Sequence, residues 1–160
     1  MRSFDRRHFL ATTAATAAML GTAEAQGAET PNVALVKSLY AAFGKGDIAS
    51  IVAAMAPDVD WRVIGRASDV PTFGARKGPA GVKEFFDLVA SSYTISEFAP
   101  EEFYPVGDKV FVIGHYTMTI KKTGKSTASD WLHIFTIMGG KVTAFREFLD
   151  TASAAEAFRS

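Results

Sequence analysis

The sequence predicts an α+β fold in which three N-terminal helices pack in a strongly curved antiparallel sheet, giving a cone-shaped domain. Two periodicities carry this prediction. Apolar side chains recur at helical spacing up to about residue 90, which indicates amphipathic helices. From Tyr93 onward they alternate with polar side chains, which indicates strands with one buried face. Helices followed by antiparallel strands favour a layered arrangement, in which the sheet wraps around the helices and leaves a cavity.

Composition limits the classes of function. The chain has 160 residues, of which 48% are hydrophobic, and this suits one globular domain with a substantial core. Seventeen Lys and Arg residues balance seventeen Asp and Glu residues, so we expect no nucleic acid partner, which would require a broad positive field. The chain has no cysteine, which excludes disulfides, thiolate catalysis and cysteine-ligated metals.

Residues 1–25 have the three regions of an export signal peptide. Arg6 and Arg7 stand in a basic segment, the apolar segment "LATTAATAAML" follows, and Ala23-Glu24-Ala25 is a small-x-small cleavage site. The pattern around Arg6-Arg7 is similar to a twin-arginine signal, so we expect export to the periplasm or the medium by that pathway. The apolar segment is about half as long as a membrane span, which argues against a permanent anchor. The alternative is a basic terminus on a cytoplasmic protein; with export, the mature domain comprises residues 26–160.

The mature domain begins with a predicted helical hairpin. Thr30-Pro31 offers an N-cap followed by proline at the first helical position, and Gly44 can end the helix. Asp47 then caps a second helix, which must end before Pro57. A third helix is marked by apolar residues at helical spacing, namely Val82, Phe85, Phe86 and Val89.

The other predicted elements are strands. The segment "VDWRVIG" is a short strand that carries Trp61, and the Gly- and Pro-punctuated stretch 65–79 is a loop. Beyond Tyr93, turns at 106–108 and 123–124 separate long strands, so we expect antiparallel sheet for the rest of the chain. Gly139-Gly140 is a tight turn between the last two strands.

Four stretches together resemble the SnoaL-like branch of the nuclear transport factor 2-like superfamily. They are "LYAAFGKGDIASIVAAMAPDVDW", "FGARKGPAGVKEFF", "DWLHIF" and "FREFLDT", and the similarity covers essentially the whole mature domain. The resemblance implies an α+β barrel or cone with a deep pocket, commonly a homodimer that pairs through the sheet. The superfamily includes polyketide cyclases, steroid isomerases, epoxide hydrolases, dehydratases and members with no catalysis, so the fold alone does not identify the function.

The resemblance to ketosteroid isomerases can be followed residue by residue. These enzymes use a Tyr in the first helix and an Asp base just after the first strand. Leu39 and Val63 stand at those two positions here, and neither side chain can donate or accept a proton. Tyr40 is one residue further along, about a hundred degrees around the helix. We therefore do not expect double-bond isomerisation by that mechanism.

The SnoaL-like cyclases provide a closer match. They place an acid/base carboxylate on the final strand and a His on the neighbouring strand, and they use neither a metal nor an organic cofactor. The resemblance therefore implies that Glu147 is the acid/base catalyst and that His133 or Arg146 is a polar orienting group, with no cofactor. Arg146 has an alternative role, in a surface or interface ion pair with Asp130 or Asp150.

The parity of the last hairpin leaves two arrangements open. A two-residue turn at Gly139-Gly140 pairs His133 with Arg146 and puts Glu147 on the opposite face of the sheet. A bulge at Gly140 or further along restores His133 and Glu147 to one face.

Aromatic residues are the candidates for a substrate-binding wall. A carboxylate between Phe145 and Leu149 is costly without a partner, so Glu147 is expected at the polar end of a cavity. The mature domain has two histidines and no usual metal-ligand spacing, so no metal site is expected. Small-molecule pockets are lined mainly by apolar side chains. The candidate wall residues are Tyr40, Trp61, Phe73, Phe85, Trp131 and Phe145.

Two functions are compatible with the sequence. The first is a cofactor-independent isomerase, cyclase or lyase that acts on a small apolar carbonyl compound. The second is a non-catalytic periplasmic protein of the same fold that binds a small molecule or serves as a scaffold. Measuring ligand binding and turnover separately distinguishes the two.

Replacing both Arg6 and Arg7 with Lys tests the export route. The twin-arginine pathway recognises the arginine pair rather than its charge, so we expect the Lys-Lys precursor to accumulate in the cytoplasm. Fractionation of cells that express either form measures this. Unchanged export of the Lys-Lys form would assign the signal to general secretion instead.

Overall fold

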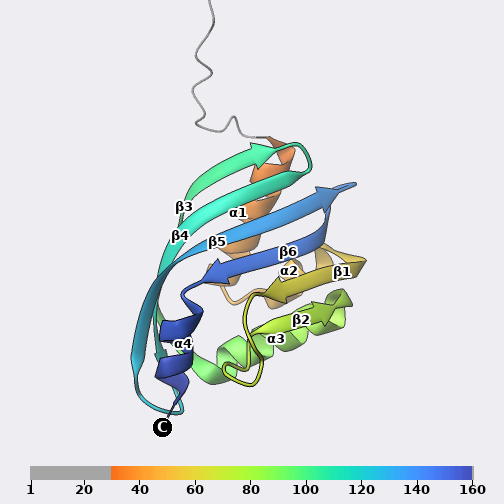
Figure 1. Ribbon diagram of the computed structural model, residues 1–160. Helices are drawn as coiled ribbons and strands as arrows, with labels where there is room; N and C mark the ends of the chain where they lie inside the picture. Colours follow the sequence, from red (N-terminus) through yellow and green to blue (C-terminus); the bar gives the residue numbers. More distant parts are fainter. Residues whose placement is uncertain (1–29, 160) are drawn as a thin grey trace, which may run out of the picture.

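In the part of the chain that the structure describes, six strands form a single sheet that curves around the helices (Figure 1). The computed structural model describes residues 30–159, so the expected export signal lies outside the described residues. The strand order is β2-β1-β6-β5-β4-β3. The strands are β1 (Met55–Val63), β2 (Gly74–Lys77), β3 (Tyr93–Val106), β4 (Lys109–Ile120), β5 (Ser126–Met138) and β6 (Lys141–Leu149).

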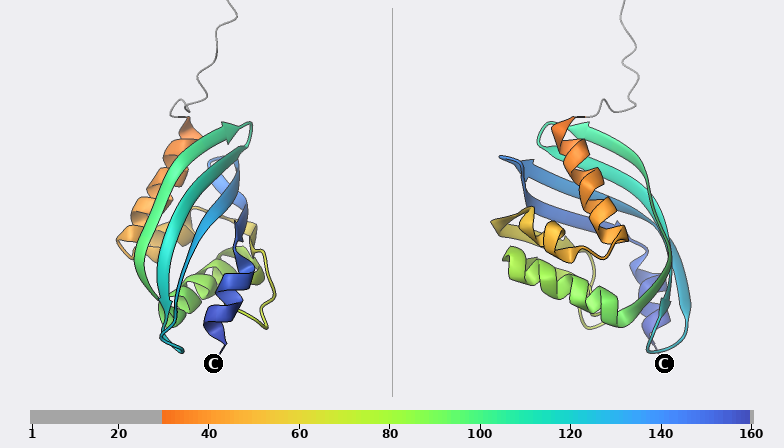
Figure 2. Two further views of the ribbon diagram at one scale, coloured as in Figure 1. Left: turned by 60° about the vertical axis from the view of Figure 1, so that its left-hand side comes forward. Right: turned by 180° about the vertical axis from the view of Figure 1, so that it is seen from behind.

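The first three helices cover the concave side of this sheet, and the fourth follows the last strand at one end of it. They are α1 (Pro31–Gly44), α2 (Ile48–Ala53), α3 (Gly78–Ser92) and α4 (Thr151–Phe158). The view from behind in Figure 2 shows α1, α2 and α3 in front of the sheet. The predicted α+β class with a curved sheet is therefore confirmed. Within residues 30–159, no helix is long and apolar enough to cross a membrane.

The first two helices begin where local capping chemistry places them. Thr30 Oγ1 accepts a hydrogen bond from the Val33 backbone N–H at 3.2 Å, and Asp47 Oδ1 accepts one from the Ser50 backbone N–H at 3.0 Å. Each bond satisfies a backbone donor that has no partner within the helix. The predicted helical hairpin is confirmed at both N-caps.

Two features of the chain between the second and third helices differ from the prediction. β1 begins at Met55, so Pro57 lies inside the strand rather than before it. The pairing of β1 with β6 is irregular between Met55 and Asp60, and such irregular pairing tolerates a proline without a backbone N–H. The predicted loop 65–79 also contains the short edge strand β2, which pairs with β1.

The C-terminal segment corrects the expectation of sheet to the end of the chain. Asp150 Oδ1 accepts hydrogen bonds from the backbone N–H groups of Ala152 and Ser153, and this cap starts α4. The sheet is not wholly antiparallel either, because β1 pairs with β6 in the parallel direction.

The β5–β6 hairpin resolves the question of parity. Gly139 and Gly140 both have positive φ angles, of 57° and 74°, as a two-residue type I′ turn requires. Ile137 pairs with Val142, but Thr136 pairs with Ala144, so Thr143 is an extra residue in β6. This bulge shifts the register by one residue. His133 then lies directly opposite Glu147, on the same face of the sheet.

Aromatic stacking fixes the centre of the core. Trp61 is 4% exposed and stacks on Phe145, with the ring centroids 3.9 Å apart. Phe85 and Phe86 of α3 also pack against the indole, with their ring centroids 5.5 and 5.8 Å from that of Trp61. Trp61 thus joins β1, β6 and α3 in one packed cluster.

Substituting Trp61 with Ala tests this packing. Large-to-small changes of a buried aromatic residue remove both transfer free energy and packing, so we expect a loss of about 3–5 kcal/mol in the free energy of unfolding. Urea denaturation measures it, and Trp61→Phe serves as a control that keeps an aromatic ring. An unshifted midpoint for the Ala variant would contradict the placement of Trp61 in the core.

Candidate functional site

The concave face of the sheet and the helices enclose a cavity of about 110 Å³. Its wall is mostly aromatic and aliphatic. Among the described residues, no Lys or Arg lines it. The polar side chains in the wall are Tyr40, Thr72, Tyr93, Tyr116, Thr127, His133 and Glu147. An apolar cavity with a few convergent polar groups is typical of a small-molecule site.

His133 is a polar ring held inside the aromatic core. It is 6% exposed and stacks on Trp131, with the ring centroids 3.9 Å apart. Phe145 meets it edge-on at 4.9 Å. Its Nδ1 atom shares a hydrogen bond of 2.9 Å with the hydroxyl of Tyr40 on α1. Helix and sheet together therefore fix the orientation of the imidazole.

The second ring nitrogen of His133 faces Glu147. Nε2 lies 3.5 Å from Glu147 Oε1, and it makes no hydrogen bond with any described residue. If Tyr40 donates its proton to Nδ1, Nε2 carries a proton toward the carboxylate, which is attractive. The other tautomer would turn a lone pair toward the carboxylate, which is repulsive. The first tautomer is therefore favoured, and Nε2–H is an available donor beside Glu147.

Glu147 contributes to the raised pKa values of the phenols in the cavity wall. Burial raises the pKa of Tyr40 well above its ordinary value, and the neighbouring carboxylate of Glu147 adds to the increase. Burial raises the pKa of Tyr93 to about 12; a hydrogen bond with Thr72 opposes this and Glu147 adds to it. Burial and then Glu147 raise the pKa of Tyr116 as well. All these hydroxyls keep their protons at neutral pH and can donate hydrogen bonds.

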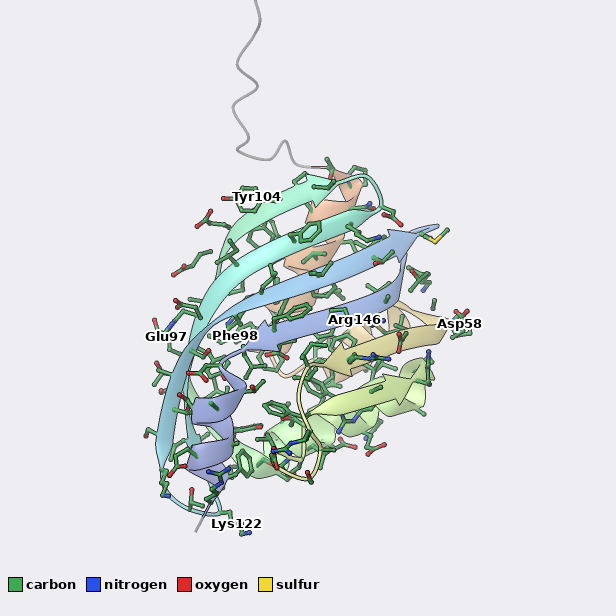
Figure 3. The ribbon with its side chains drawn as sticks, in the orientation of Figure 1. Asp58, Glu97, Phe98, Tyr104, Lys122 and Arg146 are labelled. Carbon is green, nitrogen blue, oxygen red and sulfur yellow. The ribbon has the colours of Figure 1, made fainter. Side chains whose placement is uncertain are left out.

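Arg146 lies on the other face of the sheet and does not join His133 and Glu147. Figure 3 shows it on the side of the sheet that faces away from α1–α3. It forms an ion pair with Asp60 of β1 and donates to the Asp60 carbonyl oxygen at 2.8 Å. Burial alone would raise the pKa of Asp60, but hydrogen bonds from Arg146 and Lys77 outweigh it, so the pKa is lowered. The structure therefore gives Arg146 a strand-joining position rather than the predicted orienting one.

The ion-pair partners considered for Arg146 have other contacts. Asp130 lies 2.9 Å from Nδ1 of His115, and Asp150 caps α4. The partner of Arg146 is Asp60, 86 residues away in the chain, and sequence spacing gave no signal for it.

Most of the predicted aromatic wall is present. Tyr40, Trp61, Phe73, Phe85 and Phe145 line the cavity. Trp131 does not line it; its indole lies behind His133 and stacks on Phe98, with the centroids 5.2 Å apart. Trp131 thus supports the imidazole rather than forming the wall.

Sequence reasoning missed the hydroxyl groups of the cavity. Thr72 lies in the segment between β1 and β2, and its Oγ1 is 2.7 Å from the hydroxyl of Tyr93. Tyr116 lies on β4 and Thr127 on β5. Period-two alternation puts Tyr116 on the buried face, but nothing local distinguishes a hydroxyl in a cavity from one in a packed core.

The described part of the chain contains no group of three or more His, Asp or Glu side chains that could hold a metal ion. His115 and His133 are on adjacent strands, but His115 pairs in register with Asp130 and contacts it away from the cavity.

Comparison with known proteins places this fold and site in context. None of the curated protein sequences matches the chain significantly. A structure of an NTF2-like protein from Burkholderia xenovorans is 32% identical, covers 81% of this chain and 96% of its own, and superposes with a TM-score of 0.74. An NTF2-like protein of unknown function from Burkholderia pseudomallei is 28% identical, with 82% and 99% coverage and a TM-score of 0.73.

A third similar structure contains a small molecule. TerC, co-crystallised with polyporic acid, is 32% identical, with 82% and 100% coverage and a TM-score of 0.73. The sequence profile of the SnoaL-like domain matches residues 36–145, more than half of the chain. Together with the enclosed cavity and the curved sheet, this match shows that the chain belongs to the SnoaL-like domain family, within the NTF2-like fold.

Proposed function

We propose that the protein is a cofactor-independent acid/base enzyme that acts on a small, uncharged carbonyl compound. The observation that carries this proposal is the pairing of Glu147 with His133 at the polar end of an apolar cavity. The carboxylate and the imidazole Nε2 are 3.5 Å apart, close enough to act on neighbouring atoms of one ligand. Neither group is held in a tight mutual hydrogen bond, so both are available to a substrate.

In the proposed reaction, Glu147 removes a proton from the carbon next to the carbonyl group. The electron pair of the C–H bond forms the enolate, whose oxygen accepts a hydrogen bond from His133 Nε2–H. The Tyr40 hydroxyl, 2.9 Å from Nδ1, holds the imidazole in the donating tautomer. Protonated Glu147 can then return the proton to another carbon, giving an isomer. Alternatively, the enolate carbon attacks a second carbonyl carbon, whose π electrons move to its oxygen, and that oxygen takes the proton from Glu147, giving a ring with a hydroxyl group.

The apolar wall supports this chemistry in two ways. A low effective dielectric strengthens the hydrogen bond from His133 to a developing negative oxygen. The described lining contains no Lys or Arg, so no cation of the wall competes with the substrate for the Glu147 carboxylate.

The position of Glu147 offers a substitute for the base of the ketosteroid isomerases. Val63, which stands at the position of that base, pairs in register with Glu147 on the neighbouring strand. Val63 and Leu39 both line the cavity. The acid/base group is thus supplied from β6 instead of β1, and Tyr40 acts through His133 instead of contacting the substrate oxygen directly.

The cavity volume limits the substrate. An apolar cavity of about 150 Å³ takes a molecule of the size of benzene, and this cavity measures about 110 Å³. We therefore propose a substrate with one small ring or an equivalent chain. The co-crystallisation of TerC, a relative of 32% identity, with polyporic acid supports an organic ligand for this family member as well.

A non-catalytic binding protein is the second candidate. The aromatic wall would favour apolar ligands whether or not a reaction follows, and Glu147 could serve only to accept a hydrogen bond from the ligand. The two candidates differ in whether a carbon-bound proton of the ligand exchanges.

Glu147→Gln tests the proposed base. The probe is 3-cyclohexen-1-one, a six-membered ring whose C2 protons are activated by both the carbonyl group and the double bond. In D₂O we expect the wild-type protein to accelerate deuterium incorporation at C2 over buffer, because Glu147 removes these protons. We expect the acceleration by Glu147→Gln to be at least about 100-fold smaller than that by the wild-type protein, which is the scale of general-base catalysis. Proton nuclear magnetic resonance (NMR) measures the exchange.

Glu156→Gln is the matched control, because Glu156 is an exposed residue of α4 whose carboxylate pairs with Arg159. We expect it to retain the wild-type rate. Binding of the probe without accelerated exchange in the wild-type protein would support the binding-protein candidate and contradict the enzyme. Equal acceleration by Glu147→Gln would rule out Glu147 as the base.

We also propose that the protein is a homodimer that pairs through the convex face of the sheet. Ile113 and Phe148 are 39% and 43% exposed, and Leu132 lies between them in register on β5. The three side chains form an apolar row across adjacent strands, and burying such a row against a second copy is favourable.

Ile113→Asp tests the dimer, because a carboxylate in the middle of an apolar interface is costly. We expect sedimentation velocity to show a dimer for the wild-type protein and a monomer for Ile113→Asp. Met138→Asp is the control; Met138 is more exposed, at 62%, but lies at the β5–β6 turn, away from this row. A monomeric wild-type protein would contradict the proposal.

A further inference from the structure

A second polar group lies in the cavity, away from His133 and Glu147. Thr72 and Tyr93 both line the cavity, and their hydroxyl oxygens are 2.7 Å apart. Thr72 is 5% exposed, and Tyr93 is half-buried. Buried hydroxyl groups in an apolar wall cost free energy unless their hydrogen-bonding capacity is used.

The sheet register places this pair at the opposite end of the cavity from His133. On β4, Val112 is the neighbour of His133 and Ile120 is the neighbour of Tyr93, eight residues further along. Phe158 of α4 packs edge-on against Tyr93, with the centroids 5.7 Å apart. Thr72, Tyr93, His133 and Glu147 nevertheless line one and the same cavity, whose volume is only about 110 Å³. One compact ligand can therefore contact both ends.

The hydroxyl pair has one hydrogen-bond donor to spare. Two hydroxyl groups carry two protons, and the bond between them uses one. No acceptor for the other proton is found among the described residues. At the His133 end, the Nε2 atom likewise lacks a hydrogen-bond partner in the described chain. Each end of the cavity thus presents an unused hydrogen-bonding group to whatever fills it.

The segment that carries Thr72 is held in place. The Arg76 guanidinium donates to the carbonyl oxygens of Pro71 and Thr72 at 2.8 and 3.0 Å. Gly65 has a φ of +143°, and a Cβ atom there would overlap the ring of Phe73. Such close backbone packing requires glycine. The Thr72 hydroxyl is therefore held in position before a ligand binds, and a ligand can form a hydrogen bond with it without any shift of the segment.

We infer that the substrate carries two oxygen atoms on opposite sides of one small ring. The first is the carbonyl oxygen that accepts from His133, so the inference rests on the proposed function. The second accepts the spare proton of the Thr72–Tyr93 pair. It is an uncharged carbonyl or hydroxyl oxygen, because the cavity wall has no described cation to balance an anion and Glu147 would repel one. Thr72 and Tyr93 are thus specificity-determining residues.

Two probes of the same ring size test this inference: cyclohexane-1,4-dione, which has oxygens on opposite sides, and cyclohexanone, which has one. Their dissociation constants are measured by ligand-observed NMR titration. One additional neutral hydrogen bond corresponds to roughly five- to tenfold in affinity, so we expect the wild-type protein to prefer the dione by about that factor. Either hydroxyl group alone still carries one free proton, so the decisive variant is Thr72→Val/Tyr93→Phe, which removes both. It should reduce this preference to about twofold or less, while its affinity for cyclohexanone stays within about twofold of wild type.

Thr72→Ser is the matched control, since it keeps the hydroxyl group and should keep the preference for the dione. Both substitutions nearly keep the shape of the side chain: Tyr93→Phe keeps the ring that packs on Phe158, and Thr72→Val keeps the branch at Cβ. The inference is overturned if the wild-type protein does not prefer the dione, or binds neither probe, or if Thr72→Val/Tyr93→Phe keeps the full preference.

The result is separable from the test of Glu147. If Glu147 is not a base, deuterium exchange into 3-cyclohexen-1-one is absent, but the preference for the dione and its loss in Thr72→Val/Tyr93→Phe are unaffected. If the Thr72–Tyr93 pair does not bind a second ligand oxygen, deuterium exchange into 3-cyclohexen-1-one persists, and the wild-type protein shows no preference for the dione.

Discussion

The register of the β5–β6 hairpin constrains every other feature of the site. If Thr143 were paired regularly instead of bulged, the two-residue turn would place Arg146 opposite His133 and turn Glu147 to the convex face. A guanidinium would then lie in an aromatic cavity without a carboxylate partner, and Asp60 would lose its ion pair with Arg146. One bulged residue therefore sorts the two adjacent, opposite charges, with Glu147 on the concave face and Arg146 on the convex face.

This sorting explains the electrostatics of each face. On the convex face, Arg146 of β6 binds Asp60 of β1 and so links the two strands that pair in the parallel direction. On the concave face, Glu147 meets no Lys or Arg among the described lining residues; its polar neighbours there are chiefly His133 and buried phenols. The phenol of Tyr40 keeps its proton because burial and Glu147 both oppose its ionisation. A negative charge surrounded by donors rather than by cations is suited to moving a proton and poorly suited to simple ion pairing.

The parts of this structure that could be predicted are those encoded locally. The N-caps at Thr30 and Asp47 depend on residues three positions apart, and the strands after Tyr93 on a two-residue period. The pairing of Arg146 with Asp60 joins positions far apart in the chain, so no spacing rule could identify it. The sequence left the bulge as one of two arrangements, because the two turn glycines do not determine whether Thr143, three residues later, pairs with the neighbouring strand. α4 was missed although its Asp150 cap is local; the apolar strand before it was extended too far.

The two tryptophans of the chain lie on two sides of the same site. Trp61 forms part of the cavity wall, and Trp131 stacks on the imidazole that faces Glu147. Their indoles are 4% and 3% exposed, so solvent contributes little to their surroundings. The tryptophan fluorescence of the protein is therefore an optical reporter of the site: filling the cavity changes the environment of one indole, and protonating the imidazole changes that of the other. Occupancy and protonation can be followed in the unmodified protein, without attaching a dye.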